Sequence, residues 1–397
     1  MLHPDNTTPL VTINVLYDVG SRDENPDRTG FAHLFEHLMF GGSVGAESFD
    51  DPIQNAGGEC NAFTNSDVTN FFSVLPASNI ELGLFLEADR MHRLILNERS
   101  LEVQRKVVTE EFKETCLNQP YGDLWHHLAP LSYKAHSYMW PTIGRELDHI
   151  AQASLDDVAN FYNKYYGPDN AICVIAGNFD RDEVLRLLDK HFAPISSRNH
   201  PQRTISAEPR QDGERRLEHF ASVPVDTIFM TFHMGGRTDP LYYTADMLSD
   251  ILGSGKSSRL HQKLVREQTL CSEIDAYISG TVDPGLLIIE AKPSNGHDLA
   301  EIETTIRQEL NDLSNGNIDS DEIDRHKHKI ESSIGFANCS ILNKAMNLAY
   351  FELIGEAELI NTELDHYREI TPEQLVNTAS DLFREGNTNT LYYRRAQ

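Results

Sequence analysis

The sequence lacks several features that would each point to a particular class of protein. It contains no run of eighteen apolar residues, so it encodes no membrane span. Its five cysteines are widely separated and include no C-x-x-C pair, which argues against a disulfide framework. Residues 1–6 have neither the basic start nor the apolar stretch of a signal peptide. We expect a periplasmic protein if a leader has been trimmed, and a cytoplasmic one otherwise.

Basic residues are also scarce. The chain has 34 lysines and arginines against 61 acidic residues, a formal net charge of −27. This balance opposes binding to nucleic acid and provides no basic patch for anionic lipid. Two interpretations stay open: a solvated acidic surface that maintains solubility, or acidic groups that line a cavity and favour basic ligands.

The sequence contains an internal repeat. Residues 154–176 contain a capping serine, an amphipathic helix, an Asn-containing loop and an apolar strand, and residues 371–393 repeat this order. The halves also begin alike, because residues 11–17 and 227–233 each form an expected strand followed by glycine and a helix. The chain therefore contains two similar α/β domains, in which helices cover one face of a sheet.

A polar, proline-containing stretch separates the two halves. We expect a zinc-bearing catalytic domain over residues 1–197 and a linker over residues 198–213. A homologous domain without metal, over residues 214–397, would close the substrate chamber.

The strongest chemical signal lies in residues 30–40. His33 and His37 are four residues apart and Glu36 lies between them, so all three share one face of a helix. Two imidazoles at this spacing can hold one Zn²⁺, and the neighbouring carboxylate can take a proton from water. This is the inverted H-x-x-E-H pattern of metallopeptidases. A chance surface patch is the alternative explanation.

A third ligand is expected from a second helix. Glu111 is spaced to share a face with Val107 and Val108, so we expect it to face inward. An inward carboxylate without a partner is costly, which makes Glu111 a better ligand candidate than Glu110. Phe112 extends the apolar side of this helix.

Several segments resemble the pitrilysin, insulin-degrading enzyme and mitochondrial processing peptidase family of zinc peptidases, in particular its bacterial members of about 400 residues. The resemblance covers nearly the whole chain. It is carried by RTGFAHLFEHLMFGG at 28–42, GGECNAFT at 57–64, VVTEE at 107–111, NQPYG at 118–122 and GSGKSSRL at 253–260. It implies an α+β fold of two similar domains, each a mixed, mostly antiparallel sheet with helices on one face.

The resemblance also implies roles for individual residues. His33, His37 and Glu111 would bind Zn²⁺, and Glu36 would be the general base. Residues 58–64 would form an edge strand that accepts the substrate as an added β-strand. The substrate-binding candidates there are Gly58, Asn61, Ala62, Phe63 and Thr64. Asn61 would hold the scissile carbonyl; a turn residue that caps its own loop is the alternative.

Two departures from the family pattern affect the expected activity. Gln104 stands where many relatives have a glutamate that supports the metal site from behind. Active single-chain relatives place an arginine and a tyrosine in the second half, where this chain has Arg266, one residue out of register, and Ser272. A serine side chain is too short to replace a phenol. The combination resembles the zinc subunit of a two-subunit peptidase.

The sequence thus predicts a zinc metalloendopeptidase that hydrolyses short or unfolded peptides with a paralogous partner subunit or as a homodimer. We expect a preference for basic peptides if the acidic residues line the substrate chamber. A non-catalytic scaffold or assembly subunit with the same fold is one alternative, and a hydrolase of non-peptide amides is another. Substrate identity is left open. His126, His127 and His136 show no partners at ligand spacing, and we interpret them as surface or packing residues.

Overall fold

The computed structural model describes residues 1–198, 200 and 202–396; residues 199 and 201 of the expected linker and residue 397 lie outside this description. The chain forms two compact units, each assembled from separate stretches of sequence. The first unit comprises residues 1–117, 136–206 and 335–360. The second comprises residues 118–135, 207–334 and 361–397.

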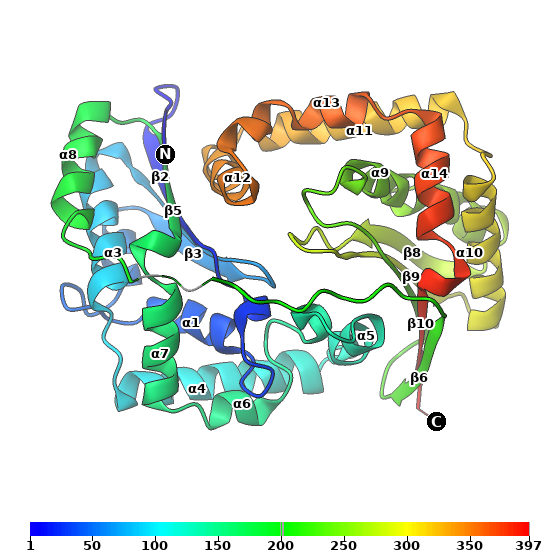
Figure 1. Cartoon of the computed structure of the whole chain (residues 1–397), viewed down its shortest axis with the longest axis horizontal. Helices are drawn as coiled ribbons and strands as arrows, with labels where there is room; N and C mark the ends of the chain where they lie inside the picture. The colour runs from blue at the N-terminus through cyan, green and yellow to red at the C-terminus, as the bar shows by residue number, and fades with distance from the viewer. Residues whose placement is uncertain (199, 201, 397) are drawn as a thin grey trace. The chain divides into compact units, whose positions relative to one another are not determined.

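A mixed sheet forms the centre of the first unit (Figure 1). Its strands, in spatial order, are β1 (Leu2–Pro4), β5 (Ala171–Gly177), β2 (Leu10–Tyr17), β4 (Thr69–Pro76) and β3 (Glu59–Thr64). Only the β1–β5 pair is parallel among these described strands. Because side chains alternate along a strand, β2 directs Val11, Ile13 and Val15 to one face and Leu16 to the other.

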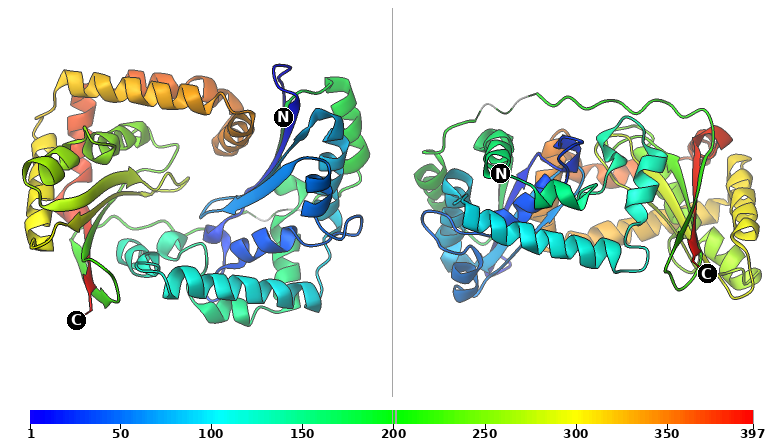
Figure 2. Two further views of the ribbon diagram at one scale, coloured as in Figure 1. Left: turned by 180° about the vertical axis from the view of Figure 1, so that it is seen from behind. Right: turned by 90° about the horizontal axis from the view of Figure 1, so that it is seen from below.

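Most helices of the first unit cover the face that Ile13 and Val15 share. Those helices are α1 (Phe31–Met39), α2 (Asp50–Asn55), α3 (Ile80–Arg93), α4 (Glu98–Phe112), α6 (Leu147–Ala151), α7 (Leu155–Tyr165) and α8 (Arg181–Phe192). Figure 2 shows α1 and α4 side by side, and this pairing positions the candidate site.

A helix from the second half of the sequence covers the opposite face of this sheet. This helix, α12 (Ile341–Ile354), packs against β2 and β5. Its Ala345 and Ala349 are fully buried with Leu16 and Val174. Small side chains at these two positions let the helix approach the sheet closely.

The second unit repeats this arrangement. Its strands lie in the order β6 (Arg215–Ala221), β10 (Thr388–Arg395), β7 (Thr227–His233), β9 (Leu286–Pro293) and β8 (Cys271–Ile278). Again only one described pair, β6–β10, is parallel. Its further helices are α9 (Tyr242–Gly253), α10 (Leu299–Ser314), α11 (Ser320–Ala337), α13 (Glu363–Arg368) and α14 (Pro372–Leu382).

The opposite face of the second sheet is covered by α5 (Leu124–Ser132), a helix from the first half of the sequence. Leu128 of α5 is fully buried with Phe229 and Leu391. Each sheet therefore buries its second face under a helix supplied by the other half of the chain.

These observations confirm the predicted fold class of two similar α+β domains with mixed, mostly antiparallel sheets. Ser154 and Thr371 both form the expected capping boxes, with Asp157 and Gln374 as their partners. A single boundary at residues 198–213 does not describe the two units, because each half of the chain gives one segment to the other unit. These exchanged segments are residues 118–135 and 335–360. Periodicity identifies a helix but does not say which sheet it will cover, so this exchange cannot be read from the sequence.

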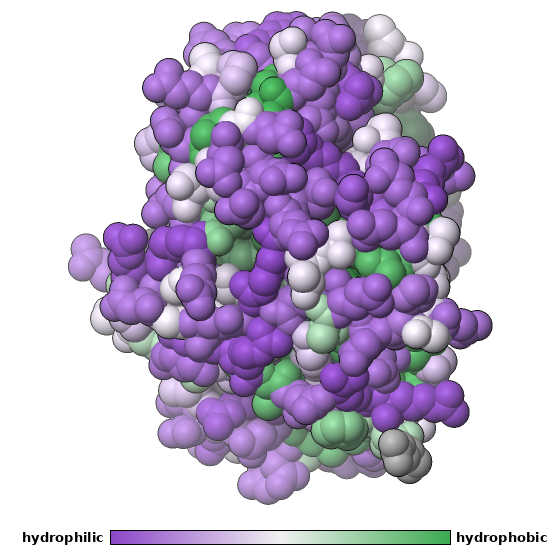
Figure 3. All heavy atoms as spheres, turned by 90° about the vertical axis from the view of Figure 1, so that its right-hand side faces the viewer, coloured by the Kyte–Doolittle hydropathy of each residue, from purple (hydrophilic) through white to green (hydrophobic). Residues whose placement is uncertain are grey.

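The surface drawn in Figure 3 is mostly hydrophilic, and apolar residues appear there only in small, separate patches. Among the described residues, no helix combines the length and apolar character needed to cross a membrane.

Candidate metal centre

Helix α1 presents the predicted catalytic residues on its less buried side. Leu34, Phe35 and Leu38 are almost completely buried in the core of the first unit. His33, Glu36 and His37 are only partly buried, because they occupy the opposite face of this nine-residue helix. The apolar positions therefore fix the rotation of α1, and that rotation brings the three polar side chains together.

The N-terminus of α1 is secured by a buried carboxylate from outside the helix. Gly30 precedes the helix in a left-handed conformation, with φ of 88°, that glycine adopts without strain. Glu24 accepts hydrogen bonds from the backbone N–H groups of Gly30 and Ala32, each at 2.9 Å. These bonds satisfy donors that have no partner within the helix.

Helix α4 carries the expected third ligand. Asn97 caps its N-terminus and Val108 and Phe112 are buried, so the helix packs firmly against α1. The expectation that Val107 faces inward with Val108 was wrong, since Val107 is 45% exposed. Glu111 lies at the edge of the buried stripe, with its side chain 36% exposed. A carboxylate at this edge can reach α1 without the full cost of burial.

The three predicted ligands converge on one point. His33 Nε2 and His37 Nε2 are 3.3 Å apart. Glu111 places Oε1 3.5 Å from His33 Nε2 and Oε2 3.2 Å from His37 Nε2. His33 and His37 belong to α1 and Glu111 belongs to α4, so the packing of these two helices forms the cluster.

These separations fit a tetrahedral zinc ion. Zinc binds histidine nitrogen and carboxylate oxygen at about 2.0–2.2 Å, and a regular tetrahedron of that size has edges of about 3.3–3.6 Å. The measured distances of 3.2–3.5 Å lie close to that range. Two histidines and a glutamate also form a typical donor set of a catalytic zinc site, which keeps one position for water.

The electrostatics of the cluster favour the protonation states that bind metal. Burial lowers the pKa of His33, although Glu111 opposes this change. A hydrogen bond from His37 lowers the pKa of Glu111 below its usual value. A neutral imidazole and an ionised carboxylate are the forms that coordinate a cation.

Glu36 is connected to the neighbouring edge strand rather than to the ligand cluster. Its Oε2 accepts a hydrogen bond of 2.6 Å from Thr64 Oγ1 on β3. This bond orients the carboxylate and leaves its other oxygen available. Thr64 was predicted as a substrate-binding residue, and the structure shows it in contact with Glu36.

Strand β3 is an edge strand, in the place that the family resemblance implied for residues 58–64. A Cβ at Gly58 would lie 2.7 Å from the Val74 carbonyl oxygen and 2.4 Å from the Leu75 side chain, so only glycine fits there. The Asn61 side chain accepts a hydrogen bond of 2.8 Å from the Ala62 backbone N–H. Asn61 therefore lies within the strand and covers one of its own backbone donors. Phe63 is 40% exposed on the outer face.

The remaining predicted residues occupy different places. Gln104 is a partly buried residue of α4, two turns before Glu111. Arg266 and Ser272 belong to the second unit and are both exposed. Ser272 Oγ donates to the Lys292 carbonyl at 3.3 Å, within its own sheet. Their roles in catalysis stay predictions.

The interpretation of His127 as a residue without ligand partners was wrong. The structure brings His127 together with Asp123 and His219 in the second unit. The Asp123–His127 spacing of four residues was a usable signal, since both lie on one side of a helical turn. His219 is far away in sequence, and only the fold reveals it.

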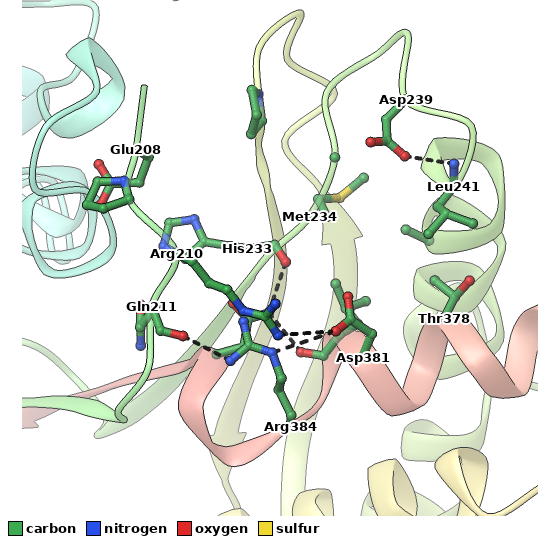
Figure 4. A pocket seen from close by; sticks show the side chains of 16 residues that line it. Glu208, Arg210, Gln211, His233, Met234, Asp239, Leu241, Thr378, Asp381 and Arg384 are labelled. Carbon is green, nitrogen blue, oxygen red and sulfur yellow. Dashed lines mark hydrogen bonds and ion pairs between the residues drawn. The ribbon is translucent and has the colours of Figure 1, made fainter. Parts of the chain in front are cut away.

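The second unit also contains a pocket of about 350 Å³ (Figure 4). Three of its charged groups are paired with one another: Asp381 lies 3.8 Å from Arg384 and 3.9 Å from Arg210. The lining residues that the structure describes include none of the predicted site residues. We assign the pocket no part in the predicted chemistry.

Comparison with known proteins identifies the family. The model described as insulinase, peptidase family M16, matches residues 1–127, and that of the M16 peptidase inactive domain matches residues 152–330. The chain belongs to the M16 peptidase family. Zinc protease PqqE of Helicobacter pylori is 29% identical over 98% of this chain and 89% of its own. The beta subunit of the mitochondrial processing peptidase of Saccharomyces cerevisiae is 23% identical over 82% of this chain and 74% of its own.

Solved M16 structures have the same fold. A protease from Helicobacter pylori superposes with a TM-score of 0.91 at 27% identity, covering 98% of this chain and 95% of its own. An M16 inactive domain from Pseudomonas fluorescens gives a TM-score of 0.89 at 15% identity, over 100% and 95% of the two chains. The second likeness concerns the fold alone.

Proposed function

We propose that this M16 chain is a zinc-dependent endopeptidase that cleaves short or unfolded peptides. The observation that carries the proposal is the cluster of His33, His37 and Glu111, with Glu36 beside it and joined to an edge strand through Thr64. Relatives named zinc proteases support it.

His33, His37 and Glu111 would hold the zinc ion. When bound, zinc polarises a water molecule and the scissile carbonyl. Glu36 takes the proton from the attacking water and passes it to the leaving amine, as a general base and then a general acid. Thr64 keeps the Glu36 carboxylate oriented for both transfers. Asn61 lies three residues before Thr64 on β3 and is our candidate for holding the carbonyl.

Replacing Thr64 tests this positioning role. Thr64→Val removes the hydroxyl donor but keeps nearly the same side-chain shape. We expect kcat/KM to fall by about tenfold, which is the lower end of the range for losing a supporting hydrogen bond. Thr64→Ser retains the donor and should recover most of the activity. Steady-state kinetics on an unfolded peptide, with zinc content measured in parallel, check this. Equal activity of the valine variant and the unaltered chain would contradict the role.

The free edge of β3 is the proposed binding surface for the substrate backbone. Backbone groups of successive residues point alternately toward and away from a neighbouring strand. The Ala62 N–H bonds to the Asn61 side chain and so faces away from β4. By the same alternation, Cys60 and Thr64 also face the free edge. An extended peptide could pair with these three residues after Asn61 releases Ala62.

Ala62→Pro would remove one of these backbone donors. Proline is tolerated at positions of an edge strand that do not bond to its neighbour, so we expect the fold and zinc content to be preserved. We expect KM for an unfolded peptide to rise by about tenfold, the equivalent of about one lost hydrogen bond. Ala62→Ser, which keeps the N–H, is the matched control. An unchanged KM in the proline variant would argue against strand addition.

We further propose that the chain acts as the zinc-bearing subunit of a two-subunit peptidase. Ser272 occupies the position of the expected tyrosine, and one relative is named as a subunit of a processing peptidase. A homodimer is the alternative assembly. A paralogous partner would supply the arginine and tyrosine that Arg266 and Ser272 do not fully replace.

The deciding experiment is digestion of one basic and one acidic unfolded peptide by the zinc-loaded chain, alone and with a candidate paralogue. We expect strong cleavage only with the partner, and faster cleavage of the basic peptide at low salt. Full activity of the chain alone would disprove the two-subunit proposal but support the peptidase. Digesting a non-peptide amide in parallel tests the other hydrolase assignment.

A non-catalytic assembly subunit is the second candidate, favoured by the inactive-domain match over residues 152–330. Metal analysis separates the two functions. A zinc ion at the first-unit cluster that is lost in His33→Ala supports the peptidase. A chain that binds no metal at the first-unit cluster at neutral pH supports the assembly role.

A further inference from the structure

The second unit contains a cluster of metal-ligating side chains that the proposed peptidase does not use. Asp123 precedes α5, and His127 follows one turn later on the same side of that helix. His219 lies in the middle of β6, the edge strand of the second sheet. Two elements that are distant in sequence therefore meet at these three residues.

One carboxylate oxygen is the common point of the cluster. Asp123 Oδ2 lies 3.0 Å from His127 Nε2 and 3.5 Å from His219 Nε2. The candidate ligand atoms all lie within 4.8 Å of one another. The two imidazole rings are tilted by 32° with centroids 3.9 Å apart, so both nitrogens approach the carboxylate from neighbouring directions. The longer distance lies within the edge of about 3.3–3.6 Å of a tetrahedral zinc site, and the shorter one lies slightly below it.

A surrounding residue holds the carboxylate in position. The Tyr393 hydroxyl on β10 donates to Asp123 Oδ1, which leaves Oδ2 facing the histidines. The Tyr393 ring also packs edge-on against His219, with centroids 4.9 Å apart. A hydrogen-bonded carboxylate and a packed imidazole are the supports that oriented metal ligands usually have.

His219 Nε2 is buried, and its contact with Asp123 is too long to be an effective hydrogen bond. Within the described part of the chain, no group gives this nitrogen a hydrogen bond of normal geometry. A buried nitrogen without a hydrogen bond destabilises the folded chain unless another group or an ion binds it. A cation between His219 and Asp123 would remove that cost.

The charge state of the cluster is also suited to a cation. Burial lowers the pKa of His219, and the neighbouring His127 lowers it further. Although burial opposes ionisation, the hydrogen bonds from Tyr393 and His127 lower the pKa of Asp123. Both shifts run in the direction of the forms that coordinate a cation. The side chains are 25–31% exposed, which leaves room for water as a further ligand.

We propose that Asp123, His127 and His219 form a second binding site for a divalent transition metal of the zinc type. Nitrogen and carboxylate ligands suit zinc better than calcium or magnesium, which prefer oxygen alone. Because α5 comes from the exchanged segment 118–135, the ion would fasten this segment to the edge of the second sheet. The site is structural rather than catalytic and is independent of the proposed peptidase.

The alternative is a hydrogen-bonded cluster without metal, in which the 3.0 Å contact of His127 with Asp123 is sufficient by itself. The two cases differ in zinc stoichiometry. The test uses the full chain with His33→Ala and Glu111→Ala, which removes the first-unit cluster. This background variant is stripped with chelator and titrated with zinc alone by calorimetry, and its melting temperature is measured with and without zinc.

We expect the background variant to bind one zinc ion and to melt at a higher temperature with zinc. Adding His219→Ala should weaken zinc binding by at least 100-fold and abolish the rise in melting temperature. Adding His126→Ala, a neighbouring histidine outside the cluster, should change neither. If His219→Ala does not fold, Asp123→Asn replaces it and should give the same loss.

Two results would overturn the proposal: no zinc bound by the folded background variant, or equal zinc affinity with and without His219. Neither result bears on the peptidase, since the first-unit cluster is absent from every protein in this experiment. Conversely, a chain that binds zinc but shows no peptidase activity would contradict the peptidase proposal and not this second site.

Discussion

Glu36→Gln is expected to abolish peptide hydrolysis while leaving zinc bound. The amide keeps the shape of the carboxylate and can still accept the hydrogen bond from Thr64. It cannot take a proton from water, and a positioned general base contributes about 10²–10⁴-fold to a rate. We therefore expect kcat to fall by about that factor in the active assembly, with KM nearly unchanged.

The matched control for this variant is Glu110→Gln. Glu110 is the same residue type and lies next to the ligand Glu111, but its side chain is 66% exposed and pairs with Lys113. Its replacement should leave activity within about twofold, because exposed ion pairs contribute little. Substantial activity in Glu36→Gln, with zinc present, would mean that another group acts as the base.

Glu111→Gln is expected to remove the zinc ion of the first-unit cluster, one zinc per chain, and with it the activity. The Glu111 carboxylate faces both imidazoles, at 3.5 and 3.2 Å, and supplies the only negative charge of the proposed ligand set. Even the loss of a supporting group behind a ligand costs about 10–100-fold in metal affinity, so the loss of a charged ligand should cost at least about 100-fold. Metal analysis after dialysis, with the same peptide assay, checks both effects.

The two variants together separate binding from chemistry. Glu36→Gln should retain the zinc ion of the first-unit cluster without activity, and Glu111→Gln should have neither that ion nor activity. Glu110→Gln again serves as the control and should have both. If Glu111→Gln binds as much zinc per chain as the unaltered protein, the third ligand lies elsewhere, which would change the assignment of α4 but not that of α1.

The features that the sequence predicts well are those with a local cause. The side chains on α1 are predictable because its apolar residues fix one face and leave His33, Glu36 and His37 on the other. Ser154 and Thr371 predict their helix starts because a cap depends only on the next three residues. The family resemblance implied that residues 58–64 form an edge strand, and β3 lies at the edge of its sheet.

Features that depend on distant contacts were missed. Val107 follows the apolar pattern of α4 but is exposed, because the helix buries only a narrow stripe. The bond from Thr64 to Glu36 joins residues 28 positions apart and needs the packing of α1 against β3. His219 lies 92 positions after His127, and no spacing rule connects a strand residue to a helix at that distance.

The exchanged helices α5 and α12 also set the order in which the chain can fold. The first sheet is complete in sequence at Gly177, but the helix that covers Leu16 and Val174 is not synthesised until residue 354. During synthesis one apolar face of the first sheet therefore stays exposed until α12 has been made. An exposed apolar face promotes aggregation or chaperone binding. Once both helices have docked, each half of the sequence covers a sheet face of the other half, so neither unit can be completed from one half of the sequence alone.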